Sequence, residues 1–461
     1  MLRITNTLTK RKEDFIPQNP LQVSMYTCGV TVYDDCHIGH ARSLYTFDVI
    51  RRYLKYRGFD VTFVRNITDI DDKIINRANE LEINWHELVG KYIERYYEDL
   101  KILGIEKADY EPRATENIED MIRYIAVLVE KGYAYESGGD VYFNVRKFPG
   151  YGKLSGQNIE EMETGTRISP TEFKKDPLDF ALWKASKEGE PFWGSPWGNG
   201  RPGWHIECSV MSRKFLKTDT LDIHAGGRDL VFPHHENELA QAESFSGKTF
   251  AKYWIHHGLL TINGQKMAKS LGNFVTIRNF IDTYKNADLL KLFFLSAHYS
   301  HPIDYSEEKI GEAKKQKNSF DSFFQMRYIV PKDSPTMEIV VEDKRKIDAI
   351  LEKVIQAMDN DFNTPQVLSC LFELRDFAVV LGNSASFAYA RDCMEKLFTI
   401  FNLEVKTQIT LTEELLAKHY ERDSARIRKD FGKADRLRKE IENLGYILED
   451  HKGITACKRK T

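Results

Sequence analysis

Two histidines three positions apart, His37 and His40, follow an apolar stretch and flank Gly39. Two imidazoles can donate hydrogen bonds to triphosphate oxygens, and a glycine lets a flat base approach the backbone closely. The apolar stretch predicts a buried strand ending near Cys28, and residues 41–57 predict a helix. Strand, loop and helix start in this order are typical of phosphate sites, because free N–H groups and the helix dipole point at the ligand. Without other support, histidines at a helix start are more often local caps than catalysts.

Two lysines far downstream, Lys266 and Lys269, follow the dipeptide Asn263-Gly264. Lysines three apart on a glycine-flanked loop can both contact one polyphosphate. Most lysine pairs are simply solvated, so the pair indicates a nucleotide site only together with the two histidines.

Four separated side chains offer a zinc-type donor set. Cys28 ends the first predicted strand, Cys208 lies in a later segment, and His234 and Glu238 share a face of one predicted helix because they are four apart. Two thiolates, an imidazole and a carboxylate suit tetrahedral zinc. The spacing is not a zinc-finger pattern, so the alternative is that the cysteines are small buried hydrophobes.

Other polar side chains compete for such roles. His235 and Glu236 are rival ligands, expected to point elsewhere if His234 and Glu238 point inward, and His224 could orient a ligand or the substrate. Three acidic residues at a predicted helix start suit either Mg²⁺ or helix capping; they are Asp69, Asp71 and Asp72.

Composition and length restrict the class of protein. The 461 residues suffice for several domains, and 42% hydrophobic and 29% charged residues are ordinary for a soluble protein. No apolar run approaches a membrane span, and the basic and acidic N-terminus does not resemble a signal peptide. Six scattered cysteines predict no disulfide framework, and a reducing cytoplasm is the expected compartment. Cys36, Cys370 and Cys393 are expected in packed positions, and Cys457 exposed in a basic tail.

Charge is unevenly distributed along the chain. Residues 418–461 hold 13 Lys/Arg and 8 Asp/Glu, a net +5 in a chain of net charge −3, which leaves −8 for the remainder. A basic tail on an acidic body favours an anionic partner, and a solvated charged helix is the alternative.

The elements that must position these residues alternate between strand and helix at first. A second buried strand is expected at residues 61–66 and a helix opens near Asp69, which predicts a parallel sheet with right-handed crossovers. From residue 113 a helix (119–131), short strands and a Gly/Pro-rich run (192–200) indicate an insertion. The sheet is expected to resume near Trp204, with a strand at 221–227. Residues 312–402 predict a helical bundle broken at 361–365, and residues 424–444 one basic helix before a strand pair near Ile447 and Ile454.

The predicted fold class is therefore α/β, with a Rossmann-like parallel-sheet domain that carries an insertion, then an α-helical bundle, then a small basic domain. The expected boundaries are 1–112 and 201–250 for the two halves of the sheet domain, 113–200 for the insertion, 251–310 for the region with the lysine loop, 311–402 for the bundle and 403–461 for the basic domain.

The residues His37 to His40, together with Lys266-Met267-Ala268-Lys269-Ser270, resemble the two signatures of class I aminoacyl-tRNA synthetases. The second departs at Ala268, where the family usually has serine. The whole chain resembles the cysteinyl-tRNA synthetases, most closely in the runs 66–73 and 232–238. The resemblance implies a zinc ion held by Cys28, Cys208, His234 and Glu238.

The resemblance also implies the activity. Cysteine would attack the α-phosphate of ATP to give cysteinyl-adenylate and pyrophosphate, and the terminal adenosine of tRNA(Cys) would then take the cysteinyl group. Catalysis would depend on His37, His40, Lys266 and Lys269, which with Gly39 bind ATP and its Mg²⁺. The substrate contacts implied or proposed are Cys28, Gly29, Thr31, Trp204, His224 and Asp229. Arg426, Asp435 and Asp450 would read anticodon bases in the basic domain.

Further expectations follow from the same likeness. The enzyme is expected to be a cytoplasmic monomer, with L-cysteine, ATP and tRNA(Cys) as its partners and no membrane contact. Zinc separates cysteine from serine by preferring thiolate, so no editing domain is needed, and the insertion looks too short for one. After Gly453 the family commonly has an aromatic residue, and Ile454 to Cys457 offer none.

Two rival functions remain open at this point. A cysteine ligase acting on an amino sugar would share the catalytic body and zinc site but would not need a basic RNA-facing domain. A catalytically silent zinc- or RNA-binding relative would not need both pairs of phosphate-binding residues.

We predict that Lys269→Ala slows adenylate formation far more than it weakens cysteine binding, because the lysine charge matters most as negative charge moves onto the leaving pyrophosphate. One such contact typically contributes about 10²–10³ in rate. Cysteine-dependent pyrophosphate exchange measures this, and a change confined to the KM for ATP would contradict it.

Overall fold

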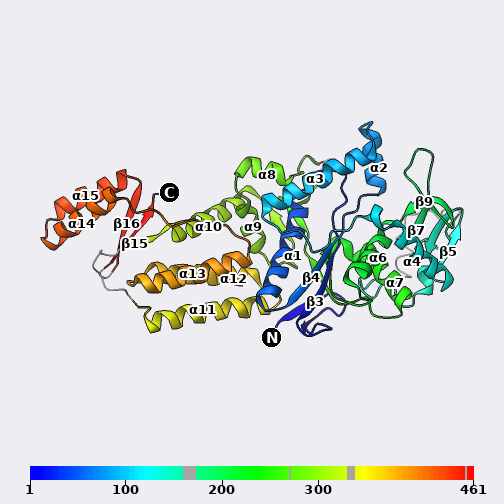
Figure 1. The fold of residues 1–461 in the computed structure, drawn as a ribbon, viewed down its shortest axis with the longest axis horizontal. Coiled ribbons are helices and arrows are strands. Elements are labelled where there is room, and N and C mark those ends of the chain that lie inside the picture. The colour runs from blue at the N-terminus through cyan, green and yellow to red at the C-terminus, as the bar shows by residue number, and fades with distance from the viewer. Residues whose placement is uncertain (159–172, 269–270, 330–337, 452–453, 461) are drawn as a thin grey trace. The chain divides into compact units, whose positions relative to one another are not determined.

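The computed structural model describes residues 1–158, 173–268, 271–329, 338–451 and 454–460. The chain forms two compact units (Figure 1). The first comprises Met1–Lys285 and Tyr299–Asp304, and the second comprises Asn286–His298 and Tyr305–Thr461. No helix of the described residues is long and apolar enough to cross a membrane.

A four-stranded parallel sheet lies at the centre of the first unit. Its order is β11 (Ala251–His257), β10 (Leu221–Gly227), β3 (Gln22–Thr27) and β4 (Asp60–Arg65). The helix α1 (Ile38–Tyr56) connects β3 to β4, while α7 (Glu236–Ser246) connects β10 to β11. The chain therefore leaves β3 towards one edge of the sheet and leaves β10 towards the other edge. The position between these two neighbouring strands is the switch point, where open α/β sheets place ligands. The predicted parallel sheet is confirmed.

Residues 204–216 form helix α6 (Trp204–Leu216), so the expectation that the sheet resumes near Trp204 is wrong. Strand β9 (Gly198–Pro202) ends just before this helix, and Gly203 caps it. A side chain at Gly203 would lie 2.0 Å from the carbonyl oxygen of Ala181, so the chain turns close against a neighbouring strand here. The central sheet resumes at β10.

The insertion is a separate antiparallel sheet in the first unit. Its strands are ordered β5 (Ala134–Ser137), β6 (Asp140–Phe143), β7 (Phe180–Ala185), β9 and β8 (Trp193–Ser195). Helix α4 (Ile118–Glu130) precedes it, and both α4 and the sheet share one hydrophobic core with the central strands. A hairpin of β1 (Arg3–Asn6) and β2 (Arg11–Asp14) lies at the chain's start.

Two helices, α2 (Asp72–Glu80) and α3 (Trp85–Leu103), lie between β4 and α4. The acidic residues before α2 have structural partners. Asp71 caps α2 by accepting the N–H of Lys73, Asp69 accepts the N–H of Thr115 at 2.9 Å, and Asp72 forms an ion pair with Lys184. The capping interpretation therefore holds for Asp71, while Asp69 and Asp72 bind residues from other segments.

A short sheet and one helix complete the first unit's sequence. Strands β12 (Leu260–Ile262) and β13 (Gln265–Lys266) form a hairpin, β14 (Ile303–Tyr305) adds to it, and α8 (Ile277–Tyr284) follows the lysine loop.

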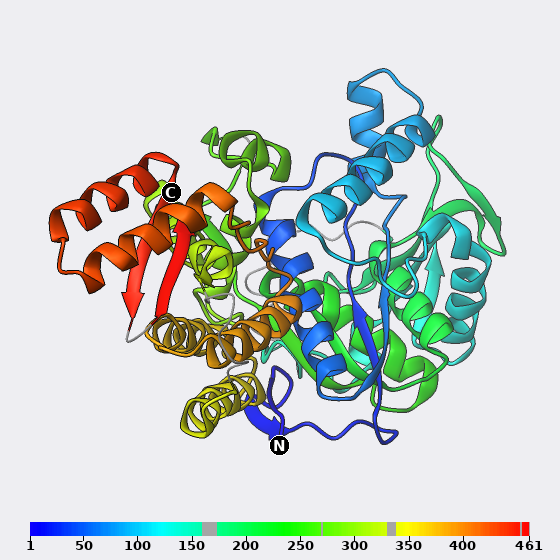
Figure 2. The same cartoon turned by 60° about the vertical axis from the view of Figure 1, so that its left-hand side comes forward.

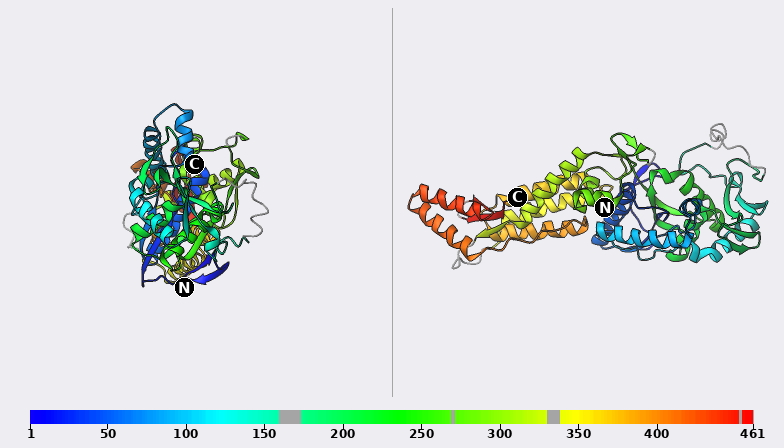
Figure 3. Two further views of the ribbon diagram at one scale, coloured as in Figure 1. Left: turned by 90° about the vertical axis from the view of Figure 1, so that its right-hand side faces the viewer. Right: turned by 90° about the horizontal axis from the view of Figure 1, so that it is seen from above.

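The second unit begins as a helical bundle. Its members are α9 (Ala287–Leu295), α10 (Glu307–Gln325), α11 (Val341–Asp359), α12 (Thr364–Val379) and α13 (Ser384–Ile400), and the later ones run side by side in the right-hand view of Figure 3. The predicted break at 361–365 is confirmed: Asp361 and Phe362 have positive φ, and Asn363 caps α12.

A small module with its own core ends the second unit. Helices α14 (Glu413–Ile427) and α15 (Phe431–Asn443) accompany a sheet ordered β15 (Arg327–Ile329), β17 (Ile454–Arg459) and β16 (Tyr446–His451); the two red strands are β16 and β17 in Figure 2. The predicted strand pair is confirmed. The prediction of a single basic helix over residues 424–444 is wrong, because Lys429 has a left-handed φ of 60° and Asp430 caps a second helix.

Cys457 lies in the core of this module and is fully buried, so the expected exposed thiol is also wrong. Burial raises the pKa of its thiol to about 12. Its position in β17, between β15 and β16, explains this: alternate side chains of a central strand point into the core.

Candidate active site and metal centre

Four predicted zinc donors converge at the switch point of the sheet. Cys28 follows β3, Cys208 lies on α6, and His234 and Glu238 lie at the start of α7. Their ligand atoms all lie within 4.8 Å of one another. Cys208, His234 and Glu238 are buried and Cys28 is partly exposed, so the cluster can be reached from the side of Cys28.

The spacing within this cluster fits a small metal ion. The Sγ of Cys208 lies 3.6 Å from Nε2 of His234, the Sγ of Cys28 lies 3.3 Å from Oε1 of Glu238, and that oxygen lies 2.8 Å from Nε2 of His234. Ligands at zinc distances of about 2.0–2.3 Å in a tetrahedron lie about 3.3–3.8 Å apart. Two of these separations match that range, and the third is a hydrogen bond that a bound ion would replace.

The charge of Glu238 is stabilised without contact with water. Burial alone would raise its pKa, but His224 and His234 outweigh burial and lower the pKa well below its usual range. Nε2 of His224 lies 2.7 Å from the second carboxylate oxygen. Burial lowers the pKa of His234. The negative charge of Glu238, together with the hydrogen bonds to Cys208 and Glu238, outweighs burial and raises this pKa to about 10.

A second donor set overlaps the first. It consists of Cys28, His224, His235 and Glu238, again within 4.8 Å of one another. The expectation for Glu236 is confirmed, since it accepts the N–H of Ser155 in the insertion at 2.8 Å. The expectation that His235 points away from the cluster is wrong, because Nε2 of His235 lies 3.2 Å from the Sγ of Cys28. His235 and Glu238 are three positions apart in helical backbone, a spacing that also brings two side chains to one side of a helix, so both His234 and His235 can face Glu238.

The ring of His234 is held from its far side. Its Nδ1 lies 2.8 Å from Nδ1 of His205, and the indole of Trp204 stacks on it with centroids 3.9 Å apart. Metal-binding histidines commonly have such partners, which fix the ring's orientation and tautomer. The expected substrate contact Trp204 therefore lies beside the cluster.

Asn66 is a residue of the site that the sequence argument did not single out. Its Oδ1 accepts the N–H of Gly29 at 2.8 Å and lies 3.7 Å from the Sγ of Cys208. A side chain at Gly29 would lie 1.6 Å from the carbonyl oxygen of Asn66, so only glycine fits. The position of Asn66 directly after β4 was the available signal.

His37 and His40 cap helix α1 reciprocally. The N–H of His40 donates to Nδ1 of His37 at 3.2 Å, and the N–H of His37 donates to Nδ1 of His40 at 3.3 Å. The rings stack with centroids 3.7 Å apart. Because each Nδ1 accepts a hydrogen bond, each ring is assigned as the neutral tautomer with its proton on Nε2. Burial lowers the pKa of His37 to about 4, and burial with the charge of His37 lowers that of His40.

Capping and phosphate binding are thus compatible rather than alternatives. The backbone occupies Nδ1 of each ring, which leaves two Nε2–H donors at the helix N-terminus. Lys73 at the start of α2 is close enough for its charge to lower the pKa of His40 further, and the sequence argument gave Lys73 no role.

The lysine loop joins the same helix start. The N–H of Ile38 donates to the carbonyl of Val275 at 3.0 Å, and that of Ile277 donates to the carbonyl of Cys36 at 2.9 Å. A side chain at Gly39 would lie 3.5 Å from the methyl carbon of Met267, so the loop passes close to Gly39. Lys266 is exposed on β13, and Lys269 lies outside the described residues.

Ala268 has a backbone role in this loop. Its N–H donates to Oδ1 of Asn273 at 2.8 Å, and the amide of Asn273 donates to the carbonyl of Lys266. Of the remaining expected contacts, Thr31 pairs with Thr68 beside the site, and exposed Asp229 acts electrostatically on His37.

The three residues expected to contact tRNA lie in the small module of the second unit. Arg426 and Asp450 form an ion pair at 2.9 Å, and buried Arg422 also binds Asp450. Asp435 is exposed on α15. Phe431, the first residue of α15, is 63% exposed, which the sequence argument overlooked. Exposed aromatic rings among cations are typical of single-stranded RNA contacts.

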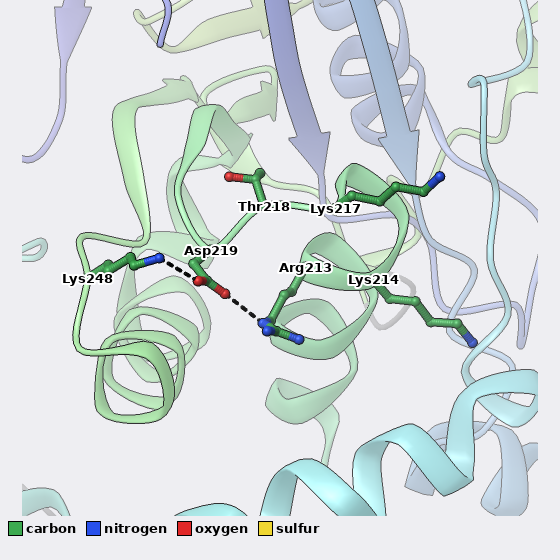
Figure 4. A pocket seen from close by; sticks show the side chains of 6 residues that line it. All are labelled: Arg213, Lys214, Lys217, Thr218, Asp219 and Lys248. Atoms are coloured by element: carbon green, nitrogen blue, oxygen red, sulfur yellow. Dashed lines mark hydrogen bonds and ion pairs between the residues drawn. The ribbon is translucent and has the colours of Figure 1, made fainter. Parts of the chain in front are cut away.

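A basic pocket of about 470 Å³ lies elsewhere in the first unit (Figure 4). Its lining residues precede β10 and β11, at the amino ends of the strands; they are Arg213, Lys214, Lys217, Thr218, Asp219 and Lys248. Asp219 pairs with Arg213 at 2.7 Å and with Lys248 at 2.9 Å. Open α/β sheets bind substrates at the opposite, carboxyl ends. This pocket is therefore separate from the candidate active site.

Comparison with known proteins places this fold and site in a class. Residues 14–315 match the model of the class I (C) tRNA synthetase catalytic domain, and residues 353–403 match that of the DALR domain. Methionyl-tRNA synthetase of Mycobacterium tuberculosis, solved with methionyl-adenylate, shares the fold with a TM-score of 0.60 at 15% identity, over 82% of this chain and 89% of that one. The first unit therefore has the catalytic fold of class I aminoacyl-tRNA synthetases.

Two relatives with high sequence identity identify the family within this class. The cysteine–tRNA ligase of Geobacillus thermodenitrificans (strain NG80-2) is 48% identical over 465 residues, 99% of each chain. That of Clostridioides difficile (strain 630) is 46% identical over 471 residues, 99% of this chain and 100% of the relative. The chain belongs to the cysteine–tRNA ligase family, also called the cysteinyl-tRNA synthetases.

The neutral His37 should make stability depend on pH. In the folded chain its pKa is about 4, below the ordinary value of 6.5, so the unfolded chain binds a proton first as the pH falls. The contribution is fully present above pH 6.5 and decreases between pH 6.5 and 4, by at most about 1.4 kcal/mol per pH unit.

His37→Asn keeps a capping oxygen but does not titrate. Urea unfolding of both proteins at pH 7 and 5 should show the wild type losing more free energy of unfolding than the variant. Because all other histidines are shared, equal losses would contradict the neutral assignment of His37.

Proposed function

We propose that the enzyme activates L-cysteine with ATP and transfers it to tRNA(Cys), and that it selects cysteine through a zinc ion bound by Cys28, Cys208, His234 and Glu238. The single observation that carries the proposal is the convergence of these donors at the switch point of the sheet, where the loop after β3 also leads to the paired histidines that start α1. Amino-acid and nucleotide chemistry would then take place at one edge of the sheet.

The donor chemistry supports zinc at the first cluster. Two thiols with one imidazole and one carboxylate match the ligands that zinc prefers, whereas the overlapping set offers one thiol. We therefore assign His224 and His235 to supporting positions. When bound, zinc would supply an acceptor that prefers thiolate to hydroxyl, which is the one chemical difference between cysteine and serine.

The protein's own groups would position the substrate around that acceptor. Cys28 marks the reachable side of the cluster, and Gly29, Thr31 and Trp204 lie along the same strand end and helix start. A hydrophobic pocket alone separates near-isosteres only about 10²-fold, so selection through the thiol is the stronger device. Asp229 is a candidate partner for the amino group or the ribose.

The phosphates of ATP would lie at the N-terminus of α1. Each of His37 and His40 presents one Nε2–H donor there, and the helix adds free N–H groups. Lys266 and Lys269 would stabilise charge on the departing pyrophosphate, and Mg²⁺ would arrive largely with the phosphates. Neutral imidazoles donate without adding charge, so the lysines and Mg²⁺ are assigned the charge compensation.

The small module would bind the anticodon region of tRNA. The motive is the net charge of +5 over residues 418–461, which make up most of the module, together with the exposed ring of Phe431. Because Arg426 already pairs with Asp450, the two would act as one fixed unit, while Asp435 would contact bases from α15. Phe431 could replace the missing aromatic residue after Gly453 as a stacking surface.

The rival ligase acting on an amino sugar is not supported. The relatives named cysteine–tRNA ligase match nearly the entire chain, including the basic module. We further propose that the enzyme is monomeric and works in the cytoplasm, where its six free thiols would remain reduced.

Cys208→Ser tests the zinc proposal. The change replaces a soft donor by a hard hydroxyl while keeping the size of the side chain, so metal content and cysteine-dependent pyrophosphate exchange should fall together. Cys370→Ser, a buried cysteine of the helical bundle, is the matched control and should keep both. A folded Cys208→Ser protein with wild-type zinc and exchange would exclude this ligand set.

Phe431→Ala tests the module. Stacking of one base contributes about 1–3 kcal/mol, so the KM for tRNA should rise roughly 5- to 150-fold while pyrophosphate exchange stays unchanged. Ile427→Ala, which removes a side chain 82% exposed at the end of α14, should leave both reactions unchanged. Point variants are preferable to deletion of the module, because deletion would leave β15 without its partner β17. Undiminished charging by Phe431→Ala would argue against stacking there.

A further inference from the structure

Helix α3 is connected by arginine–carboxylate pairs to both segments that would bind ATP. Nη1 of Arg95 on α3 lies 2.5 Å from both carboxylate oxygens of Asp35, which lies two residues before His37. Arg278 on α8 donates to Glu98 of α3 at 2.5 Å. In Figure 1 α3 lies near both α1 and α8.

The second of these pairs acts on the anchor of the lysine loop. Helix α8 begins at Ile277, the residue whose N–H donates to Cys36, and Thr276 caps it. Arg278 is therefore one residue from the strand-like pairing that joins the loop's end to the start of α1. A shift of Arg278 relative to α3 would move this pairing and, through it, the loop that carries Lys266.

A second carboxylate on α3, Asp99, faces the same guanidinium but does not engage it fully. Asp99 is 0% exposed, and within the described chain neither of its oxygens has a hydrogen-bond partner. Nε of Arg278 also lacks one, and it lies 3.6 Å from Oδ1 of Asp99. A buried carboxylate without a hydrogen bond is costly, and native proteins rarely retain one without a reason.

The surroundings of Asp99 offer limited compensation. Its nearest charged neighbours are Arg278 from α8, Arg95 and Glu98 from its own helix, and Asp35 from the loop before α1. Burial, with Asp35 and Glu98, outweighs the two arginines and raises the pKa of Asp99 to about 7. The carboxylate is therefore held in an unfavourable state, which a direct bond from Arg278 would relieve.

We propose that Asp99 and Arg278 are positioning residues for adenylate formation: their contact tightens to a direct hydrogen-bonded ion pair when ATP binds, and α3 thereby holds the lysine-loop anchor against the start of α1. This rests on the proposed function at the same site. The unpaired Oδ1 of Asp99 and Nε of Arg278 lie 3.6 Å apart, so a small shift would join them, and the joined arrangement would gain the hydrogen bond that both groups lack here. A pair that does not touch ATP can favour its binding only if it stabilises the ATP-bound arrangement more than the other arrangement.

The alternative is that Asp99 merely stabilises the packing of α3. The two roles predict opposite effects on stability. A structural carboxylate should weaken the fold when removed, whereas an unsatisfied buried carboxylate should not, because its removal also removes a desolvation cost.

Asp99→Asn tests the proposal with the full-length enzyme. In cysteine-dependent pyrophosphate exchange, kcat/KM for ATP should fall on the order of tenfold, the size of a typical coupling between sites, while the KM for cysteine is unchanged. The melting temperature should be equal to or above that of the wild type. Asp99→Leu, which leaves no unsatisfied amide, should repeat both results. Asp282→Asn, an exposed carboxylate on α8, is the control and should change neither.

A double-mutant cycle assigns the effect to the pair. Arg278→Gln should reproduce the loss, Arg278→Lys should recover part of it, and Asp99→Asn with Arg278→Gln should be no worse than the poorer single variant. Additive losses, or a lower melting temperature with equal effects on ATP and cysteine, would overturn the proposal.

Hydrogen exchange separates this inference from the proposed function. MgATP alone should protect the amides of residues 275–284 in the wild type and protect them less in Asp99→Asn. Equal protection in both proteins would refute the positioning role. Failure of the wild type to exchange pyrophosphate with cysteine would instead refute the proposed activity and leave the ATP-dependent protection as the test of the pair.

Discussion

A fully buried carboxylate, Glu238, sets the strongest constraint on the catalytic unit. An ionised group without water must be compensated by nearby donors, and two histidines from different elements provide them: His224 from the middle of β10 and His234 from the turn before α7. The two rings can reach one carboxylate only if β10 and α7 keep their present register. Further rings then orient these two, with Trp254 stacked on His224 and Trp204 on His234. The core beside the candidate metal centre is consequently aromatic and polar at once, with two histidines on one carboxylate and an indole stacked on each of them.

The start of α1 shows how local folding can determine chemistry. The helix needs acceptors for its first N–H groups, and His37 and His40 supply them reciprocally with Nδ1. That requirement leaves the proton on Nε2 and directs it away from the helix. An ionised aspartate, which is a common capping residue, would satisfy the backbone but would present no outward donor. The same two side chains thus complete the secondary structure and prepare the surface on which phosphate would bind.

Patterns that depend on neighbours in the sequence were predictable, and contacts made across elements were not. Hydrophobic runs indicated β3, β4 and β10, and the order of the motifs indicated their shared edge. Helical spacing placed His234 and Glu238 together, but His235 is three positions from Glu238 and shares that side of the helix as well, which the sequence argument did not consider. Residues 204–216 were assigned to the sheet although they form α6, since a helix buried on most faces loses the 3.6-residue pattern. Lys429 carries a left-handed backbone without being glycine, so the break between α14 and α15 had no composition signal. Cys457 seemed exposed from its basic neighbours, while its burial depends on strand pairing with β15 far upstream.

That pairing has a consequence for how the chain is made. Ile329 of β15 is the register partner of Thr455 of β17, about 126 positions later. A ribosome adding about 5–20 residues per second would need roughly 6–25 s to supply the second strand after the first. During that interval β15 has neither β17 nor the core residues Leu448 and Cys457 to cover Ile329. An apolar strand with an open edge is a nucleus for wrong pairing between nascent chains. The helices α11, α12 and α13 lie between β15 and β17 in the chain and can pack on one another before β17 is made, whereas the sheet of the small module can close only after β17 has been made.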